Sequence, residues 1–315
     1  MSSSTDPDAT DAYRFTPADL KAGDRLPGIG AFMRIKNGAA FIEPTIRSHI
    51  DAFDEIVAVH NQCTDATPEI LARLAAEFAP KLRVFHYRPK VFAPGSEGHA
   101  REPADSPASF VNQSNYALAQ TRYRVAVKLD DDHLAMRERL SPLVARIRAA
   151  DFRPRELLCF SGLNLARDET GAVGILGTEP FSGAGDSFFF EVTPETYFIH
   201  RPRFEDFNRP RRRVLAAFTY WHLKFLKPDF GFGNRDIEAG NPRFARKRAA
   251  FLANRGVITL DDLRRRAPKL VGLTALLPLP EKQRLLAERW RRFLEATPSE
   301  AEMTAVVAAV ANPSP

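Results

Sequence analysis

Apolar and polar positions alternate in two different periods along the first third of the chain. Runs rich in β-branched residues predict strands at 29–35, 55–59 and 82–87. Between them, apolar residues recur at helical spacing over 41–53, and a second helix is expected over 68–78. This β-α-β-α-β order is typical of a parallel sheet with helices on both faces. The predicted fold class is therefore α/β, with a mostly parallel sheet flanked by helices.

A fourth strand ends in an abrupt change of character. The mostly apolar run 125–129 is followed at once by Asp130, Asp131 and Asp132. Adjacent carboxylates repel one another, and a divalent cation with oxygen ligands relieves that repulsion. Because side chains alternate along a strand, we expect Asp130 and Asp132 to reach one ion while Asp131 points away. The other interpretation is an acidic turn that caps a helix near Met136.

The second half of the chain has shorter periodic segments. Strands are expected at 157–165, 188–192 and 197–200, and 166–177 is predicted to form a hairpin with Gly171 in its turn. A helix is predicted further on because four apolar residues recur at helical spacing: Val214, Phe218, Trp221 and Phe225.

Composition divides the chain into three regions. Residues 1–26 are polar and turn-rich and are predicted to be a disordered or loosely attached tail. Residues 27–240 hold the strand-helix alternation and form the predicted main domain. Residues 241–315 are predicted to be a helical, basic C-terminal extension, with its last clear helix over 281–295.

Positive charge is concentrated in one block. The whole chain has a net charge of +6, but the block from Arg201 to Arg248 has thirteen Lys and Arg against five Asp and Glu. Such a block suits an anionic membrane, a phosphate-bearing substrate or a nucleic acid, and a solvated arginine-rich surface explains it equally well. No nucleic-acid-binding module is recognisable, so no nucleic-acid partner is expected, although a basic nucleic-acid-binding protein stays as a remote alternative.

Cysteine usage and hydropathy bear on location. Cys63 and Cys159 do not have the spacing of a metal site, which favours a reducing compartment. Residues 1–11 do not have the pattern of a secretion signal, and no apolar run reaches membrane-spanning length. We therefore expect a cytoplasmic protein. The basic block suggests that this protein could also bind peripherally to the anionic inner face of a membrane.

The order of these motifs resembles a family 2 glycosyltransferase with the GT-A fold. The resemblance covers roughly 29–149 and rests on the strand and turn at 31–37, the segment 55–67, the helix end at 115–119 and the acidic run at 128–132. It implies a metal-dependent transfer of a sugar from a nucleotide-sugar donor, a UDP-sugar being favoured. The implied acceptor is a hydroxyl of a saccharide or lipid-linked molecule in surface polysaccharide or glycan synthesis.

The resemblance also implies roles for particular residues. The nucleotide-binding half is expected over 27–150 and the acceptor half over 151–240. Asp130 and Asp132, with His222 as a third ligand, are implied to hold Mn²⁺ or Mg²⁺. The residues implied to bind the donor are Arg34, Asn37, Asn61, Asp65, Asn115, Lys128 and Asp131.

Two roles stay open on the acceptor side. An inverting transfer needs a general base, for which the candidates are Glu205, Asp206 and Asp186, the last in a glycine-rich loop. His133 competes with His222 as a metal ligand. Further basic residues that suit a phosphate are Lys224, Lys227 and Arg235.

A phosphatase of the haloacid-dehalogenase type is the alternative enzyme class. In that class, paired aspartates at a strand end act as nucleophile and general acid, which would be Asp130 and Asp132 here. Such a pair is expected on the first strand of the domain, whereas here it follows three other strands.

Overall fold

The structure is a computed structural model that describes residues 8–149, 156–183, 187–208, 211–238, 240–268 and 279–311. The chain divides into two compact units. Unit 1 consists of residues 1–131, 190–210 and 232–248. Unit 2 consists of residues 132–189, 211–231 and 249–315. The division falls inside the acidic run, so that Asp131 ends the first segment of unit 1 and Asp132 begins unit 2.

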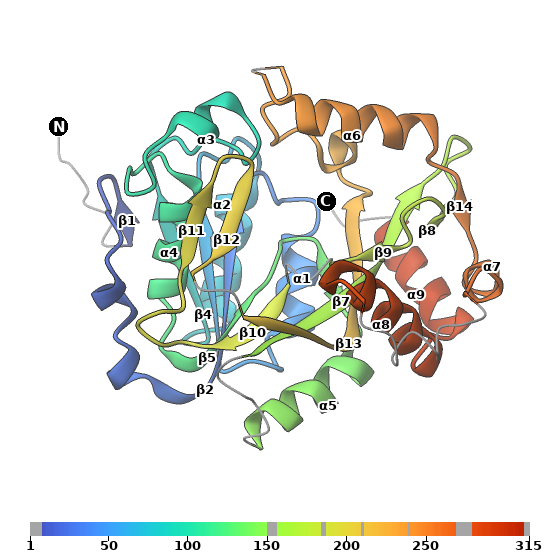
Figure 1. The fold of residues 1–315 in the computed structure, drawn as a ribbon, viewed down its shortest axis with the longest axis horizontal. Coiled ribbons are helices and arrows are strands. Elements are labelled where there is room, and N and C mark those ends of the chain that lie inside the picture. Colours follow the sequence, from blue (N-terminus) through green and yellow to red (C-terminus); the bar gives the residue numbers. More distant parts are fainter. Residues whose placement is uncertain are drawn as a thin grey trace. The chain divides into compact units, whose positions relative to one another are not determined.

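In unit 1, five strands pair in parallel in the order β1-β4-β3-β2-β5 (Figure 1). Its strands are β1 (Ala9–Thr10), β2 (Leu26–Ile35), β3 (Glu55–His60), β4 (Leu82–Tyr87) and β5 (Tyr123–Lys128). Its helices are α1 (Ile42–His49), α2 (Thr67–Glu77), α3 (Glu97–Arg101), α4 (Phe110–Ala119) and the first part of α6 (Pro242–Ala253). The predicted α/β class, with parallel strands and flanking helices, is confirmed.

Strand order locates the topological switch point of this sheet. The chain runs from β2 to β3 to β4 in one direction and then returns to the other side of β2 with β5. Right-handed crossovers therefore put α1 and α2 on one face and α4 on the other. The switch point lies between β2 and β5, and ligands of open α/β sheets bind at the carboxyl ends of such strands. Arg34 and Lys128 lie near these two ends.

A hairpin of β11 (Phe198–Arg201) and β12 (Phe204–Phe207) forms a separate two-stranded sheet beside α4 (Figure 1). Asn115 on α4 holds it by two bonds: its Nδ2 donates to the carbonyl of Phe198 at 2.9 Å, and its Oδ1 accepts from the amide of Phe198 at 2.8 Å. The hairpin also packs into the core, where the ring of Phe207 lies 4.8 Å from that of Phe190. Glu205 is thereby held in place on β12.

Residues 8–25, for which the sequence predicts loose attachment, are part of unit 1. Ala9 and Thr10 pair with β4. Two short 3-10 helices follow, Pro17–Leu20 and Ala22–Asp24, and Leu20 is fully buried.

Unit 2 has a mixed sheet with β7 and β13 as its long central strands (Figure 1). Its strands are β6 (His133–Ala135), β7 (Glu156–Arg167), β8 (Val173–Leu176), β9 (Phe181–Ser182), the first half of β10 (Phe188–Glu191), β13 (Arg212–Phe225) and β14 (Val257–Ile258). Its helices are α5 (Arg137–Arg148), α7 (Leu260–Arg265), α8 (Glu281–Glu295), α9 (Glu300–Ala311), a short 3-10 helix (Pro228–Gly231) and the end of α6. The predicted hairpin is confirmed, since β7 and β8 are antiparallel and Gly171 has a φ of +91° between them.

The helix predicted over 214–225 is wrong, because these residues form β13. The strand pairs with β7 on one side and β6 on the other, and α5 and α8 pack against it. Because both faces of β13 are covered, apolar residues occupy nearly every position of the strand. Some of these residues are spaced as in a helix by coincidence, which led to the wrong prediction. Register shifts along β13, beginning between Leu215 and Ala217, also disrupt the two-residue alternation that normally identifies a strand.

Candidate functional site

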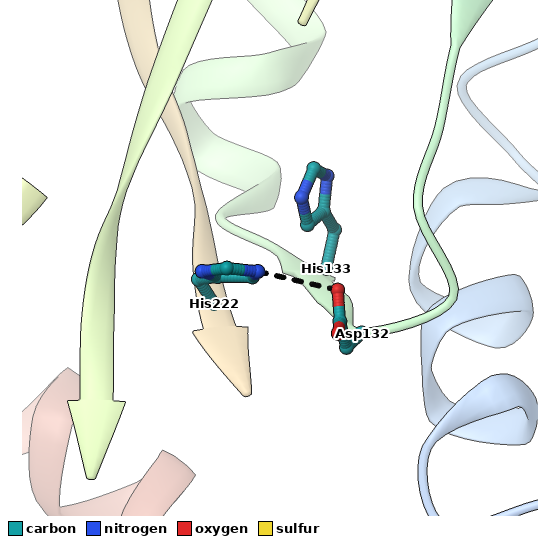
Figure 2. A group of neighbouring side chains, drawn as sticks. All are labelled: Asp132, His133 and His222. Carbon is teal, nitrogen blue, oxygen red and sulfur yellow. Dashed lines mark ion pairs between the residues drawn. The ribbon is translucent and has the colours of Figure 1, made fainter. Parts of the chain in front are cut away.

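Asp132, His133 and His222 converge in unit 2 (Figure 2). Each offers one ligand atom, and these atoms all lie within 4.8 Å of one another. The pairing of β6 with β13 creates this arrangement, since His133 lies opposite His222 in the register and the amide of Leu223 donates to the carbonyl of Asp132 at 2.8 Å. One carboxylate and two imidazoles are a donor set that suits a divalent transition metal.

Asn164 on β7 orients the ring of His222. The amide group of Asn164 donates through Nδ2 to the carbonyl of Glu179 at 2.7 Å, so its Oδ1 faces His222 at 2.6 Å from Nδ1. His222 Nδ1 therefore carries a proton and donates it. Nε2 is left facing Asp132 Oδ1 at 3.3 Å (Figure 2). A metal-binding histidine is commonly held in this way, with its second nitrogen donating to an oxygen behind it.

Lys227 balances the charge of Asp132. Its Nζ lies 2.8 Å from Asp132 Oδ2, and both side chains are largely buried. Burial acts to raise the pKa of the Asp132 carboxyl, but the charges of Lys227 and His222 hold that pKa well below its usual range. Asp132 is thus an ionised carboxylate between a histidine and a lysine.

His133 is held by stacking. Its ring lies 3.7 Å from that of Tyr220 with an angle of 18° between the planes, and Tyr220 is 1 % exposed. The hydroxyl of Tyr220 in turn donates to Ser182 Oγ at 3.0 Å. The packing of His133 is therefore rigid beside the two other candidate ligands.

A second polar cluster lies in unit 1 near the ends of β2 and β5. Arg34 Nη1 donates to Glu205 Oε2 at 2.7 Å, and Ser114 Oγ donates to the same oxygen at 2.6 Å. Lys128 Nζ lies 3.8 Å from Glu205 Oε1 and 4.0 Å from Asp130 Oδ1. The guanidinium of Arg34 also stacks on Phe110 at 4.3 Å. Arg34 and Lys128, which lie near the switch point, therefore both interact with the largely buried carboxylate of Glu205.

The three candidate general bases, Glu205, Asp206 and Asp186, differ in their surroundings. Burial acts to raise the pKa of Glu205, but Arg34 and Lys128 outweigh it and keep that pKa below its usual range, which makes Glu205 a weak proton acceptor. Asp206 is more exposed and lies 3.5 Å from Arg201. Asp186 lies outside the described residues.

Several residues with predicted roles in donor binding make contacts that stabilise the fold. Asn61 is buried and donates to the carbonyls of Tyr87 and Pro89, which ties the end of β3 to the end of β4. Asp65 accepts from the amides of Thr67 and Ala39, at the start of α2 and in the turn after β2.

Asn37 lies in the turn that follows β2, and Asp131, in the acidic run after β5, lies close to that turn. Asn37 has a φ of +52°, accepts from the amide of Thr64 at 2.8 Å and donates to Asn234 Oδ1 at 3.1 Å. Asp131 lies so close to Gly38 that a Cβ there would be 2.5 Å from Asp131 Oδ2. The side chain of Asp130 is 44 % exposed, whereas that of Asp132 is 9 % exposed.

The local sequence pattern did not predict one residue and one contact of these two clusters. Asn164 interrupts the apolar run 157–165, and a lone amide in a buried strand is a usable signal because it must find hydrogen-bond partners. The pairing of Arg34 with Glu205 joins residues 171 positions apart, and no local pattern indicates it.

No model of a known protein family matches this sequence, and none of the curated proteins is detectably similar to it. Among solved structures, residues 1–349 of TarS from S. aureus in complex with UDP share 14 % identity and a TM-score of 0.37, over 84 % of this chain and 86 % of that one.

A second solved structure is glucosyl-3-phosphoglycerate synthase from Mycobacterium tuberculosis with Mn²⁺, UDP-glucose and phosphoglyceric acid. It shares 18 % identity and a TM-score of 0.28, over 50 % of this chain and 51 % of that one. TM-scores this low do not carry a functional assignment, which has to come from the side chains.

In the part of the chain that the structure describes, no helix combines the length and the apolar character needed to cross a membrane.

Proposed function

We propose that the chain is a metal-dependent glycosyltransferase that moves a sugar from a nucleotide-sugar donor, a UDP-sugar being favoured, to a hydroxyl of a saccharide or lipid-linked acceptor. The observation that carries the proposal is the cluster of Asp132, His133 and His222, whose first member is the last carboxylate of the acidic run 130–132. The Asn164 contact supports it, because it holds the His222 ring with Nε2 directed toward Asp132.

The residues present fit a divalent cation, Mn²⁺ or Mg²⁺. Asp132 and His222 would hold it, with His133 as a further ligand. Asp130 is proposed as a ligand from its place in the acidic run. A cation there would supply positive charge to stabilise the departing nucleoside diphosphate. Because imidazole suits Mn²⁺ better than Mg²⁺, we favour Mn²⁺.

Lys227 is proposed to bind the diphosphate beside the cation. Its ammonium is a compact positive charge already held against Asp132 at 2.8 Å. In unit 1, Arg34 and Lys128 are proposed to contribute to donor binding near the switch point, where Glu205 fixes their positions. Asn37, Asn61, Asp65, Asn115 and Asp131 are proposed to shape the donor site, chiefly through the backbone contacts that they make.

For an inverting transfer, the acceptor hydroxyl attacks the anomeric carbon, the bond to the diphosphate breaks, and a base takes the hydroxyl proton. Between the two described candidates we favour Asp206, because the carboxylate of Glu205 is engaged by Arg34 and Ser114. Asp186 stays an untested prediction.

The test is direct titration of the full chain with Mn²⁺, with and without UDP, by calorimetry. We expect UDP to bind measurably only with Mn²⁺ present. Asp132→Asn and His222→Gln should each weaken Mn²⁺ binding at least tenfold, while Asp261→Asn, an exposed carboxylate on α7, should match the wild type.

Unchanged Mn²⁺ binding in both variants would refute the metal site. A panel of UDP-sugars, assayed for UDP release, then identifies the donor. Release of inorganic phosphate from a generic phosphoester, without UDP release from any sugar nucleotide, would favour the phosphatase class instead.

A further inference from the structure

Three cations surround the ring of Phe244 on α6 in unit 1. The guanidinium of Arg235 lies 4.9 Å from the ring centroid, that of Arg243 lies 5.6 Å away, and Lys247 Nζ lies 5.5 Å away. Phe244 itself is 8 % exposed, so the ring is a fixed platform. Each contact is a favourable cation–π interaction, but together they concentrate three positive charges around a single side chain.

The cluster has a rigid support in Asn241, which is 1 % exposed. Asn241 Nδ2 donates to the carbonyl of Arg235 at 2.7 Å and to that of Pro94 at 3.2 Å. Its Oδ1 accepts from the amide of Phe244 at 3.3 Å. One buried amide therefore joins the segment that carries Arg235 to the helix that carries Arg243 and Lys247.

The same segment is attached to the switch-point edge of the sheet. Asn234 donates to the carbonyl of Lys36, directly after β2, and accepts from Asn37 at 3.1 Å. Asp236 accepts from the amide of Ala93 at 3.1 Å. Within unit 1, the Phe244 cluster is thus connected to the turn that follows β2.

Two members of the cluster lack a compensating carboxylate. Among the residues that the structure describes, neither Arg243 nor Lys247 forms an ion pair; Arg243 Nη1 donates to the carbonyl of Arg203 at 2.7 Å. Because all three cations lie within 5.6 Å of one ring centroid, their charges repel one another, and a bound anion would relieve that repulsion. Guanidinium groups with a lysine beside them suit a phosphate, because arginine donates in a bidentate fork and lysine adds a point charge.

We propose that Arg235, Arg243 and Lys247 form a binding site for a phosphate group of the acceptor. The acceptor would then be a phosphorylated saccharide or alcohol, or a lipid-linked phosphate. This assignment of the acceptor rests on the proposed function, whereas the anion site itself does not.

The test compares two variants of the full chain. The probes are glycerol 3-phosphate and inorganic phosphate, titrated by calorimetry, with glycerol as the uncharged control. In Arg243→Gln/Lys247→Gln we expect glycerol 3-phosphate to bind at least tenfold more weakly. Arg246→Gln removes an exposed charge from the same helix and should bind within twofold of the wild type. The single variant Lys247→Gln changes an exposed position and should weaken binding of glycerol 3-phosphate at least threefold. It replaces the double variant in the test if the double variant does not fold.

Equal losses in Arg246→Gln and the double variant would overturn the proposal, because they would show a diffuse effect of charge. Undiminished binding in the double variant would overturn it as well. Binding to vesicles of phosphatidylcholine, with and without phosphatidylglycerol, distinguishes a phosphorylated acceptor from an anionic membrane surface. If the double variant lost binding only to the anionic vesicles and still bound glycerol 3-phosphate, the proposed site would be overturned in favour of a membrane surface.

A titration with Mn²⁺ and UDP distinguishes this failure from failure of the proposed function. The double variant should bind Mn²⁺ and UDP as the wild type does. If the wild type bound glycerol 3-phosphate through these residues but did not bind UDP, the anion site would stand and the proposed transferase would fall.

Discussion

Replacing Glu205 by Gln tests the buried charge cluster of unit 1. The substitution keeps the size of the side chain but removes its charge. Arg34 would lose an ionised partner at 2.7 Å, and Lys128 would lose one at 3.8 Å. The side chains of Glu205 and Arg34 are only 13 % and 9 % exposed, so water does not replace the lost interaction well.

The expected cost follows from this burial. Removing one partner of a buried ion pair typically costs 3–5 kcal/mol, because the other charge is left uncompensated. Since the amide oxygen of glutamine can still accept a hydrogen bond, we expect the lower end, about 3 kcal/mol at pH 7. In a domain of 150–250 residues that loss lowers the unfolding midpoint by about 6–12 °C.

The effect should depend on pH with a defined sign. The pKa of Glu205 is lower in the folded chain than its ordinary value, because Arg34 and Lys128 outweigh burial. Its contribution to stability is therefore complete above the ordinary glutamate pKa of about 4.3 and is lost as pH falls through the lower folded-state pKa. The stability difference between wild type and Glu205→Gln should shrink below about pH 4.

Urea unfolding at pH 7 and at the lowest pH where both proteins fold measures this difference. Asp206→Asn is the matched control, because Asp206 follows directly on β12 and its ion pair with Arg201 is partly exposed. We expect the control to cost less than about 1 kcal/mol. A cost for Glu205→Gln as small as that of the control, or one that does not change with pH, would refute the reasoning.

Two further substitutions follow from single contacts. Asn164→Leu removes the acceptor that holds His222 Nδ1, so Mn²⁺ should bind about 10–100-fold more weakly in a calorimetric titration; unchanged affinity would show that Asn164 does not orient the ligand. Gly38→Ala places a Cβ 2.5 Å from Asp131 Oδ2 and should cost about 1–3 kcal/mol in urea unfolding. Gly256→Ala, where no atom lies within 4 Å of the new Cβ, is the control, and equal costs would contradict the predicted clash.

Much of unit 1 could be predicted from local pattern. The strands at 29–35, 55–59 and 82–87 are confirmed because each is an apolar run between helices whose own periodicity is clear. The acidic run was also recognisable, since three carboxylates directly after a strand have no role in a core. Sequence therefore determined the class of the sheet and pointed to Asp132.

Only the tertiary structure decided what surrounds these residues. The helix predicted over 214–225 is a strand, because cover on both faces and register shifts removed the alternation by which strands are recognised. That strand, once paired with β6, brings His222 opposite His133. Tertiary structure also determines three further contacts. These are the hydrogen bond with Asn164 that orients His222, the ion pair of Arg34 with Glu205, and the grouping of cations around Phe244. These contacts join residues far apart in the chain or on different elements, and their partners are set by strand pairing and packing, which a local periodicity does not encode.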